Sequence, residues 1–219
     1  MAWRSISTPL AMTSRRLSLH ALSPPQPRAA LDKVERFYGS GVYAIYYKGG
    51  FAPYQPISGS ETPIYVGKED PQVGNARTPI EQAEKLYGRL NDHRRNIGKA
   101  TTTISIADFE YRSLVVQSGW QGAAEDYLIH LFKPVWNNET GICYGLGKHG
   151  DSPSTRANLR SPWDTLHPGR DWAHHDPSMK DARPRSQILS DLASHFGSTT
   201  IYTDLDGVMH DFIEELRQL

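Results

Sequence analysis

Cysteine is nearly absent from the chain, and long apolar runs are missing. Cys143 is the only cysteine among 219 residues. A single cysteine excludes an intrachain disulfide and any zinc site built on a cysteine cluster, and it fits a reducing compartment. No apolar run is long enough to cross a bilayer, so we expect no membrane partner.

Net charge is also missing, because 24 Lys and Arg residues balance 24 Asp and Glu residues. Composition alone therefore does not indicate a nucleic-acid-binding protein, and any basic surface must come from segregation of charge. Acidic residues are absent before Asp32, whereas arginines are present there. We interpret residues 1–31 as a flexible arm that contacts phosphates or a partner subunit, or else is only a disordered tail.

Two short runs rich in β-branched and aromatic residues, 41–47 and 64–67, predict the strands of an antiparallel hairpin. Because side chains alternate across a strand, Tyr43 should share a face with the two odd-numbered residues that follow it, and Tyr65 should share one with Gly67. The two phenols then either fill a small β-core or project from neighbouring strands toward one point.

Two capping boxes mark the starts of two predicted helices. The first, at Thr78, opens a helix over 79–97, and the second, at Ser118, opens a helix over about 119–133. Between them, β-branched residues over 101–116 predict one long strand or two short ones. The fold class expected from these elements is α+β, with a small antiparallel sheet flanked by helices.

Three polar side chains on the predicted helices are candidates for more than an ordinary solvent-exposed helix face. Arg89 and His93 lie one turn apart and therefore share a face. Glu125 lies between apolar positions of its helix, so we expect it to be at least partly buried. A carboxylate there costs free energy unless it is paired or binds a metal.

The last third of the chain carries weaker signals. A Gly-rich stretch at 141–150 resembles a phosphate-binding loop, but Ile142 and His149 replace residues that such a loop needs, so we expect no nucleotide cofactor. The cluster at 174–176 reads as a surface loop rather than a metal site. Helical patterns after Arg185 predict segments that pack on the core or form a dimer contact. We divide the chain into the arm, a core over 32–140 and an extension over 141–219.

The ordered set of polar residues resembles the GIY-YIG nuclease superfamily. The set consists of Gly41-Val42-Tyr43, Tyr65-Val66-Gly67, Arg89 with His93, Glu125, and Asn137. The resemblance covers roughly residues 41–137, with valines replacing the isoleucines of the two name-giving triplets. The arm, His93 in place of a commoner tyrosine, and the stretch Trp-Asp-Thr-Leu-His-Pro-Gly-Arg at 163–170 resemble the type II restriction endonucleases of this superfamily that cut CCGCGG.

This resemblance implies a Mg²⁺-dependent deoxyribonuclease. The implied catalytic residues are Tyr43, Tyr65, Arg89, His93, Glu125 and Asn137. Glu125 would hold one Mg²⁺ per active site, and Arg89 would contact the non-bridging phosphate oxygens. Tyr43 would contact the attacking water with His93 activating it, or His93 would act directly. Tyr65 would orient the water or the phosphate, and Asn137 would position the metal site.

The resemblance also implies partners: double-stranded DNA, a second copy of the chain in a homodimer, and a cognate DNA methyltransferase in the cytoplasm of a prokaryotic cell. A G/C-rich target favours arginine forks on guanine. The candidate DNA-contacting residues are Lys68, Arg77, Arg94, Arg156 and Arg160. Two alternatives stay open, namely a DNA repair or mobile-element nuclease of the same superfamily and a nucleic-acid-binding module without catalysis.

Overall fold

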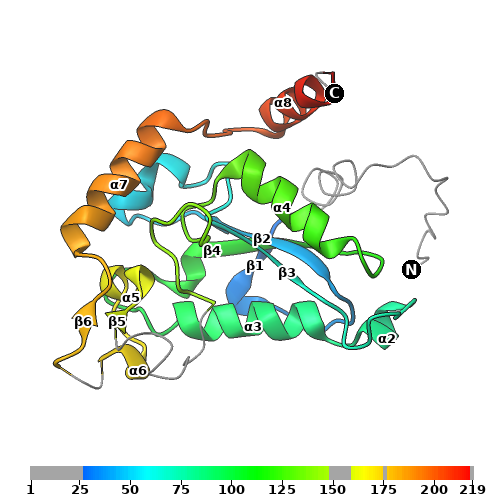
Figure 1. The fold of residues 1–219 in the computed structure, drawn as a ribbon, viewed down its shortest axis with the longest axis horizontal. Helices are drawn as coiled ribbons and strands as arrows, with labels where there is room; N and C mark the ends of the chain where they lie inside the picture. Colours follow the sequence, from blue (N-terminus) through cyan, green and yellow to red (C-terminus); the bar gives the residue numbers. More distant parts are fainter. Residues whose placement is uncertain (1–26, 148–158, 175–176, 218–219) are drawn as a thin grey trace.

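A computed structural model of the chain describes residues 27–147, 159–174 and 177–217 (Figure 1). Several features named above lie outside these described residues. They are the first 26 residues of the predicted arm, His149, Arg156, and two members of the 174–176 cluster, His175 and Asp176.

A four-stranded antiparallel sheet in the order β1-β4-β2-β3 forms the centre of the fold. Its strands are β1 (Ala29–Ala30), β2 (Gly41–Tyr47), β3 (Tyr65–Glu69) and β4 (Phe109–Val115). The predicted hairpin is confirmed, since β2 pairs with β3 and places Tyr43 opposite Gly67. All seven residues of β2 are buried, because this strand has a neighbour on each side. The α+β class is confirmed.

Short and long helices surround this sheet. In chain order they are the 3-10 helices η1 (Leu31–Lys33), η2 (Ala52–Ile57) and η3 (Ile106–Asp108) and the α-helices α2 (Pro79–Gln82), α3 (Lys85–Ile97), α4 (Gln121–Phe132), α5 (Pro162–Leu166), α6 (Asp171–His174), α7 (Arg185–Ser198) and α8 (Leu205–Arg217). A second, two-stranded parallel sheet pairs β5 (Leu159–Arg160) with β6 (Lys180–Asp181).

The two long helices α3 and α4 run along the central sheet on opposite faces (Figure 1). The odd-numbered side chains of β2 join the core cluster that contains Leu86 and Leu90 of α3. The even-numbered ones join a second cluster that contains Leu128 of α4. This division follows from the two-residue period of a strand. Strand β3 is the edge of the sheet, where the helices of both faces can reach a common point.

The helix predicted over 79–97 is wrong as a single element. The Thr78 capping box is confirmed, but the chain breaks between α2 and α3 at Ala83, whose φ is 61°. The buried side chain of Gln82 donates to the carbonyl of Val116 at 2.8 Å and accepts from the amide of Ser40 at 3.0 Å. These contacts hold the end of α2 against the ends of two strands.

Two further boundaries differ from the predictions. The segment 101–116 forms a strand only in its second half, β4, which follows η3. The predicted capping box at Ser118 is wrong, because the N-cap of α4 is Trp120 and no side chain caps it. Ser118 Oγ donates to the carbonyl of Ala76 at 2.7 Å, and Gln121 Oε1 accepts from the amide of Gly119. Helix α4 nonetheless occupies the predicted range and starts after Trp120.

The C-terminal helices pack on the core. Ile188 and Leu192 of α7 are fully buried in the α3-side cluster. Phe212 of α8 packs edge-on against Tyr127 of α4, with ring centroids 6.0 Å apart. None of the helices in the described ranges is long and apolar enough to cross a membrane.

Candidate active site

The two tyrosines of the hairpin converge, as the strand period predicts. Tyr43 and Tyr65 lie on the same face of β2 and β3, and their ring centroids are 6.0 Å apart. Gly67 leaves room for this arrangement, because a Cβ there would lie 2.5 Å from the Tyr43 hydroxyl oxygen. The glycine of the second triplet is thus required by a close approach rather than by a turn.

Helix α3 brings His93 to the first of these phenols. The Tyr43 hydroxyl and His93 Nε2 are 2.7 Å apart, and both side chains are buried. The His93 ring also packs against Tyr65, with centroids 5.0 Å apart. Burial raises the pKa of Tyr43 well above its usual value, and the neighbouring Tyr65 raises it further, whereas Arg89 acts in the opposite direction. Tyr43 is therefore a neutral phenol at neutral pH, and its hydroxyl lies within hydrogen-bonding distance of His93 Nε2.

Arg89, one turn before His93, is half-buried and held by two groups. Its Nε lies 3.5 Å from a carboxylate oxygen of Glu69, and its Nη1 donates to the carbonyl of Gly147 at 3.5 Å. Sequence reasoning missed both partners. Glu69 could have been found, because it follows Tyr65 and Gly67 on the same face of one strand. Gly147 comes from a distant loop, and no local signal in the sequence points to it.

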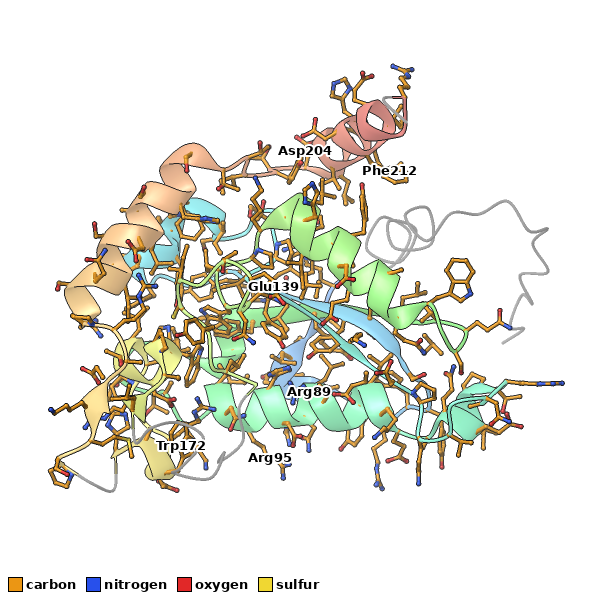
Figure 2. All side chains as sticks on the ribbon, in the orientation of Figure 1. Arg89, Arg95, Glu139, Trp172, Asp204 and Phe212 are labelled. Atoms are coloured by element: carbon orange, nitrogen blue, oxygen red, sulfur yellow. The ribbon has the colours of Figure 1, made fainter. Side chains whose placement is uncertain are left out.

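A polar cavity of about 200 Å³ lies beside these residues at the edge of β3. Its lining comprises Tyr65, Arg89, Glu125, Trp136, Asn137, Asn138, Glu139, Gly145 and Gly147. Figure 2 shows Arg89 on the side of α3 that faces α4, and Glu139 on the segment that follows α4. Tyr43 and His93 do not line the cavity, and both of their rings pack against Tyr65, which does. Glu139 is a second carboxylate that the sequence interpretation did not include.

Glu125 points into this cavity from the second turn of α4. It is partly buried, as expected from its place between apolar positions. Burial raises the pKa of Glu125 to about 7. Lys68 acts in the opposite direction, but its Nζ pairs with Asp70 at 3.2 Å. A cation bound in the cavity would favour the charged carboxylate, so this donor fits a hard divalent metal.

Asn137 has a structural task at the same edge. Its Oδ1 accepts from the amide of Val66 at 2.9 Å, and its Nδ2 donates to the carbonyl of Val66 at 2.8 Å. The side chain thus pairs with the outward-facing backbone of β3 as a neighbouring strand would. It fixes Tyr65, the residue before Val66, relative to the segment that follows α4.

The four predicted DNA-contacting residues that the structure describes come from different parts of the fold. Lys68 lies near the start of α4, 3.9 Å from the position of a Cβ built on Gly122. Arg77 is exposed on the loop before α2. Arg94 donates to Asn91 within α3. Arg160 donates to the carbonyl of Ala173 and pairs with Asp181, so its guanidinium helps to hold β5 in place.

Comparison with known proteins gives one family match. Residues 35–196, roughly three quarters of the chain, match the family model described as the Eco29kI GIY-YIG domain. No curated protein matches the chain. The matched range contains all six residues of the predicted catalytic set and reaches into α7.

Proposed function

Because this chain belongs to the Eco29kI GIY-YIG family of restriction endonucleases, we propose that it is a type II enzyme that hydrolyses DNA at the palindrome CCGCGG with the help of Mg²⁺. A member of this family is a site-specific deoxyribonuclease. The observation that carries the proposal is one cavity lined by Glu125, Arg89 and Tyr65, with the rings of the Tyr43 and His93 pair packed against Tyr65.

The chain offers a route for the proton of the attacking water. A phenol with an ordinary pKa near 10 is a poor base at neutral pH, and burial makes Tyr43 a poorer one. His93 Nε2, 2.7 Å away, can accept the phenolic proton while the phenol oxygen takes one from water. We assign Tyr43 to the water and His93 to its activation. Direct removal of a proton from the water by His93 is the alternative.

The other residues handle charge and position. Arg89 presents a planar donor fork to the non-bridging oxygens of the phosphate, held by Glu69 and Gly147. Tyr65 lines the cavity and orients the water or the phosphate. Asn137 fixes the strand that carries Tyr65.

GIY-YIG nucleases generally depend on a divalent metal. We assign one Mg²⁺ per site to Glu125, where the ion would stabilise negative charge on the leaving 3′ oxygen.

A palindrome has two identical half-sites, so we propose a C2 homodimer in the cytoplasm of a prokaryotic cell, paired in function with a DNA methyltransferase. Lys68, Arg77, Arg94, Arg160 and Arg156, the last outside the described residues, are the proposed DNA contacts.

Digestion of a plasmid panel with Mg²⁺ or with EDTA tests the function. Discrete fragments that all end at CCGCGG are expected with Mg²⁺ only. Discrete ends at another short palindrome would keep the enzyme class and refute the target. Cleavage at branched or long asymmetric sites would instead support the DNA repair or mobile-element reading. The binding module without catalysis has no support from a nuclease family.

A further inference from the structure

The segment from Ser161 to Arg170 contains a buried ion pair that is not part of the predicted catalytic set. Arg170 and Asp164 are 1% and 0% exposed. Arg170 Nε and Nη2 each lie 2.7 Å from a carboxylate oxygen of Asp164, which gives the two-point geometry of an arginine fork. The guanidinium also stacks between Trp163 and Trp172, the latter labelled on α6 in Figure 2.

The same guanidinium binds the loop that walls the cavity. Arg170 Nη2 donates to the carbonyl of Gly145 at 2.9 Å, and Nη1 donates to that of Leu146 at 3.1 Å. The carbonyl before these, of Tyr144, accepts from the amide of Trp163 at 3.0 Å. Three successive carbonyls are therefore fixed by α5 and the segment that follows it.

The next carbonyl belongs to Gly147 and faces the catalytic set. It accepts from Arg89 Nη1, and a Cβ on Gly147 would lie 2.6 Å from Arg89 Nη2. Gly147 thus lies close to the two terminal nitrogens of the guanidinium, while Glu69 lies beside Nε. A small shift of this loop would therefore turn the Arg89 guanidinium away from the cavity.

We propose that Arg170, with Asp164, is a positioning residue for the nuclease reaction: it fixes the loop 144–147 so that Gly147 aims Arg89 into the cavity. This inference rests on the proposed role of Arg89. It assigns a task to the stretch Trp-Asp-Thr-Leu-His-Pro-Gly-Arg, whose side chains lie outside the cavity lining.

The variant that tests it is Arg170→Lys. Lysine keeps a positive charge beside Asp164. Removal of the positive charge would instead leave the Asp164 carboxylate buried and unpaired. A single ammonium cannot reproduce the fork to the carboxylate and both carbonyls. We expect the single-turnover cleavage rate to fall by up to about a hundredfold, the loss that a small misplacement of a catalytic group can cause. Affinity for the duplex without metal should change by less than about threefold.

Arg183 supplies a matched control. It also binds two carbonyls, of Gly141 and Ile142, just before the loop 144–147, and pairs with an aspartate, Asp191. Those carbonyls do not line the cavity. Arg183→Lys should therefore keep the wild-type cleavage rate. Gly147→Ala is the second test variant, since it displaces Arg89 without touching the buried ion pair.

Two readouts separate positioning from general stability. In an Arg89→Lys background, Arg170→Lys should cost little further rate, because both changes disturb one group. The ¹⁵N resonance of Arg89 Nε, recorded without metal, should shift in Arg170→Lys and Gly147→Ala but not in Arg183→Lys. Additive rate losses together with an unmoved resonance would overturn the inference. A wild-type protein that cuts no DNA would refute the proposed function alone, because the resonance still reports on Arg89.

Discussion

Arg89 lines the cavity, with its guanidinium held by a carboxylate and a carbonyl. Removal of one preorganised donor to a developing charge typically costs about a hundred- to a thousandfold in rate, so Arg89→Ala should be nearly inactive. Single-turnover cleavage measures this loss, and the thermal melting temperature checks that the variant folds. Arg95→Ala is the control, because Arg95 is exposed on the opposite side of α3 (Figure 2). A loss below about tenfold would make Arg89 a structural residue.

Glu125 is the residue assigned to the metal. Glu125→Gln keeps the shape of the side chain but removes its charge, so Mg²⁺-dependent cleavage should disappear while duplex binding without metal stays near wild type. A Mg²⁺ titration of cleavage and a binding isotherm measure the two effects. Asp126→Asn serves as control, because this exposed neighbour lies outside the cavity. Cleavage of normal Mg²⁺ dependence in Glu125→Gln would contradict the metal assignment.

His167 is buried in the core, where Tyr54 and Thr103 satisfy its two nitrogens at 2.6 and 2.8 Å. Burial lowers its pKa to about 3, with Arg185 contributing in the same direction. The unfolded chain binds the proton near pH 6.5 and the folded chain does not, so stability is lost as pH falls from about 6.5 toward 3. Urea unfolding across this range should show a shallower acid loss for His167→Gln than for wild type. Parallel pH profiles of the two proteins would refute the neutral, buried histidine.

Local sequence patterns correctly predicted those helix and strand features that depend on residues close together in the chain. The hairpin follows from strand periodicity, and the Thr78 capping box lies within one turn of the chain. The break at Ala83 could not be predicted, because no Gly or Pro marks it and the neighbouring Gln82 binds a residue 34 positions away. The box at Ser118 is wrong because α4 starts after Trp120, and Ser118 instead donates to the carbonyl of Ala76, 42 positions away.

In the candidate site, too, local features could be predicted and long-range contacts could not. The spacing of Arg89 and His93 and the partial burial of Glu125 could be derived from helix periodicity. Their assignment to one catalytic set depended on resemblance to a family. Gly147, by contrast, reaches Arg89 through tertiary packing of a loop 58 residues away, and no periodic pattern encodes such a contact.

Ala83 offers a test of the break between α2 and α3. Its φ of 61° and ψ of −169° belong to a region that is nearly restricted to glycine. Ala83→Gly removes this strain at some cost in chain entropy, so we expect a net stabilisation of about 1 kcal/mol in urea unfolding. Ala123→Gly, in the exposed face of α4, is the control and should destabilise by about 1 kcal/mol. Equal destabilisation by both changes would show that Ala83 is not strained.

For the whole molecule, the decisive feature is the edge strand. Strand β3 ends the sheet, and Asn137 occupies its outward-facing backbone at Val66. The cavity therefore opens beside a strand that no further strand can cover at that point, between a helix from each face. The described part of the chain supplies one such set of side chains, whereas a duplex has two strands to cut. Under the pairing that we propose, a second chain supplies the set that cuts the other strand.

A mixed dimer tests this assembly directly. Wild-type chains and Glu125→Ala chains carrying different tags are co-expressed, and complexes holding both tags are purified. Under the proposed arrangement of one site per chain, such a heterodimer should convert a supercoiled plasmid with one CCGCGG site to the open circle, whereas a doubly tagged wild-type dimer should linearise it. Light scattering with and without the duplex gives the mass of the complex. A monomeric mass on DNA, or a heterodimer that linearises the plasmid as fast as the wild-type control, would exclude one site per chain in a C2 pair.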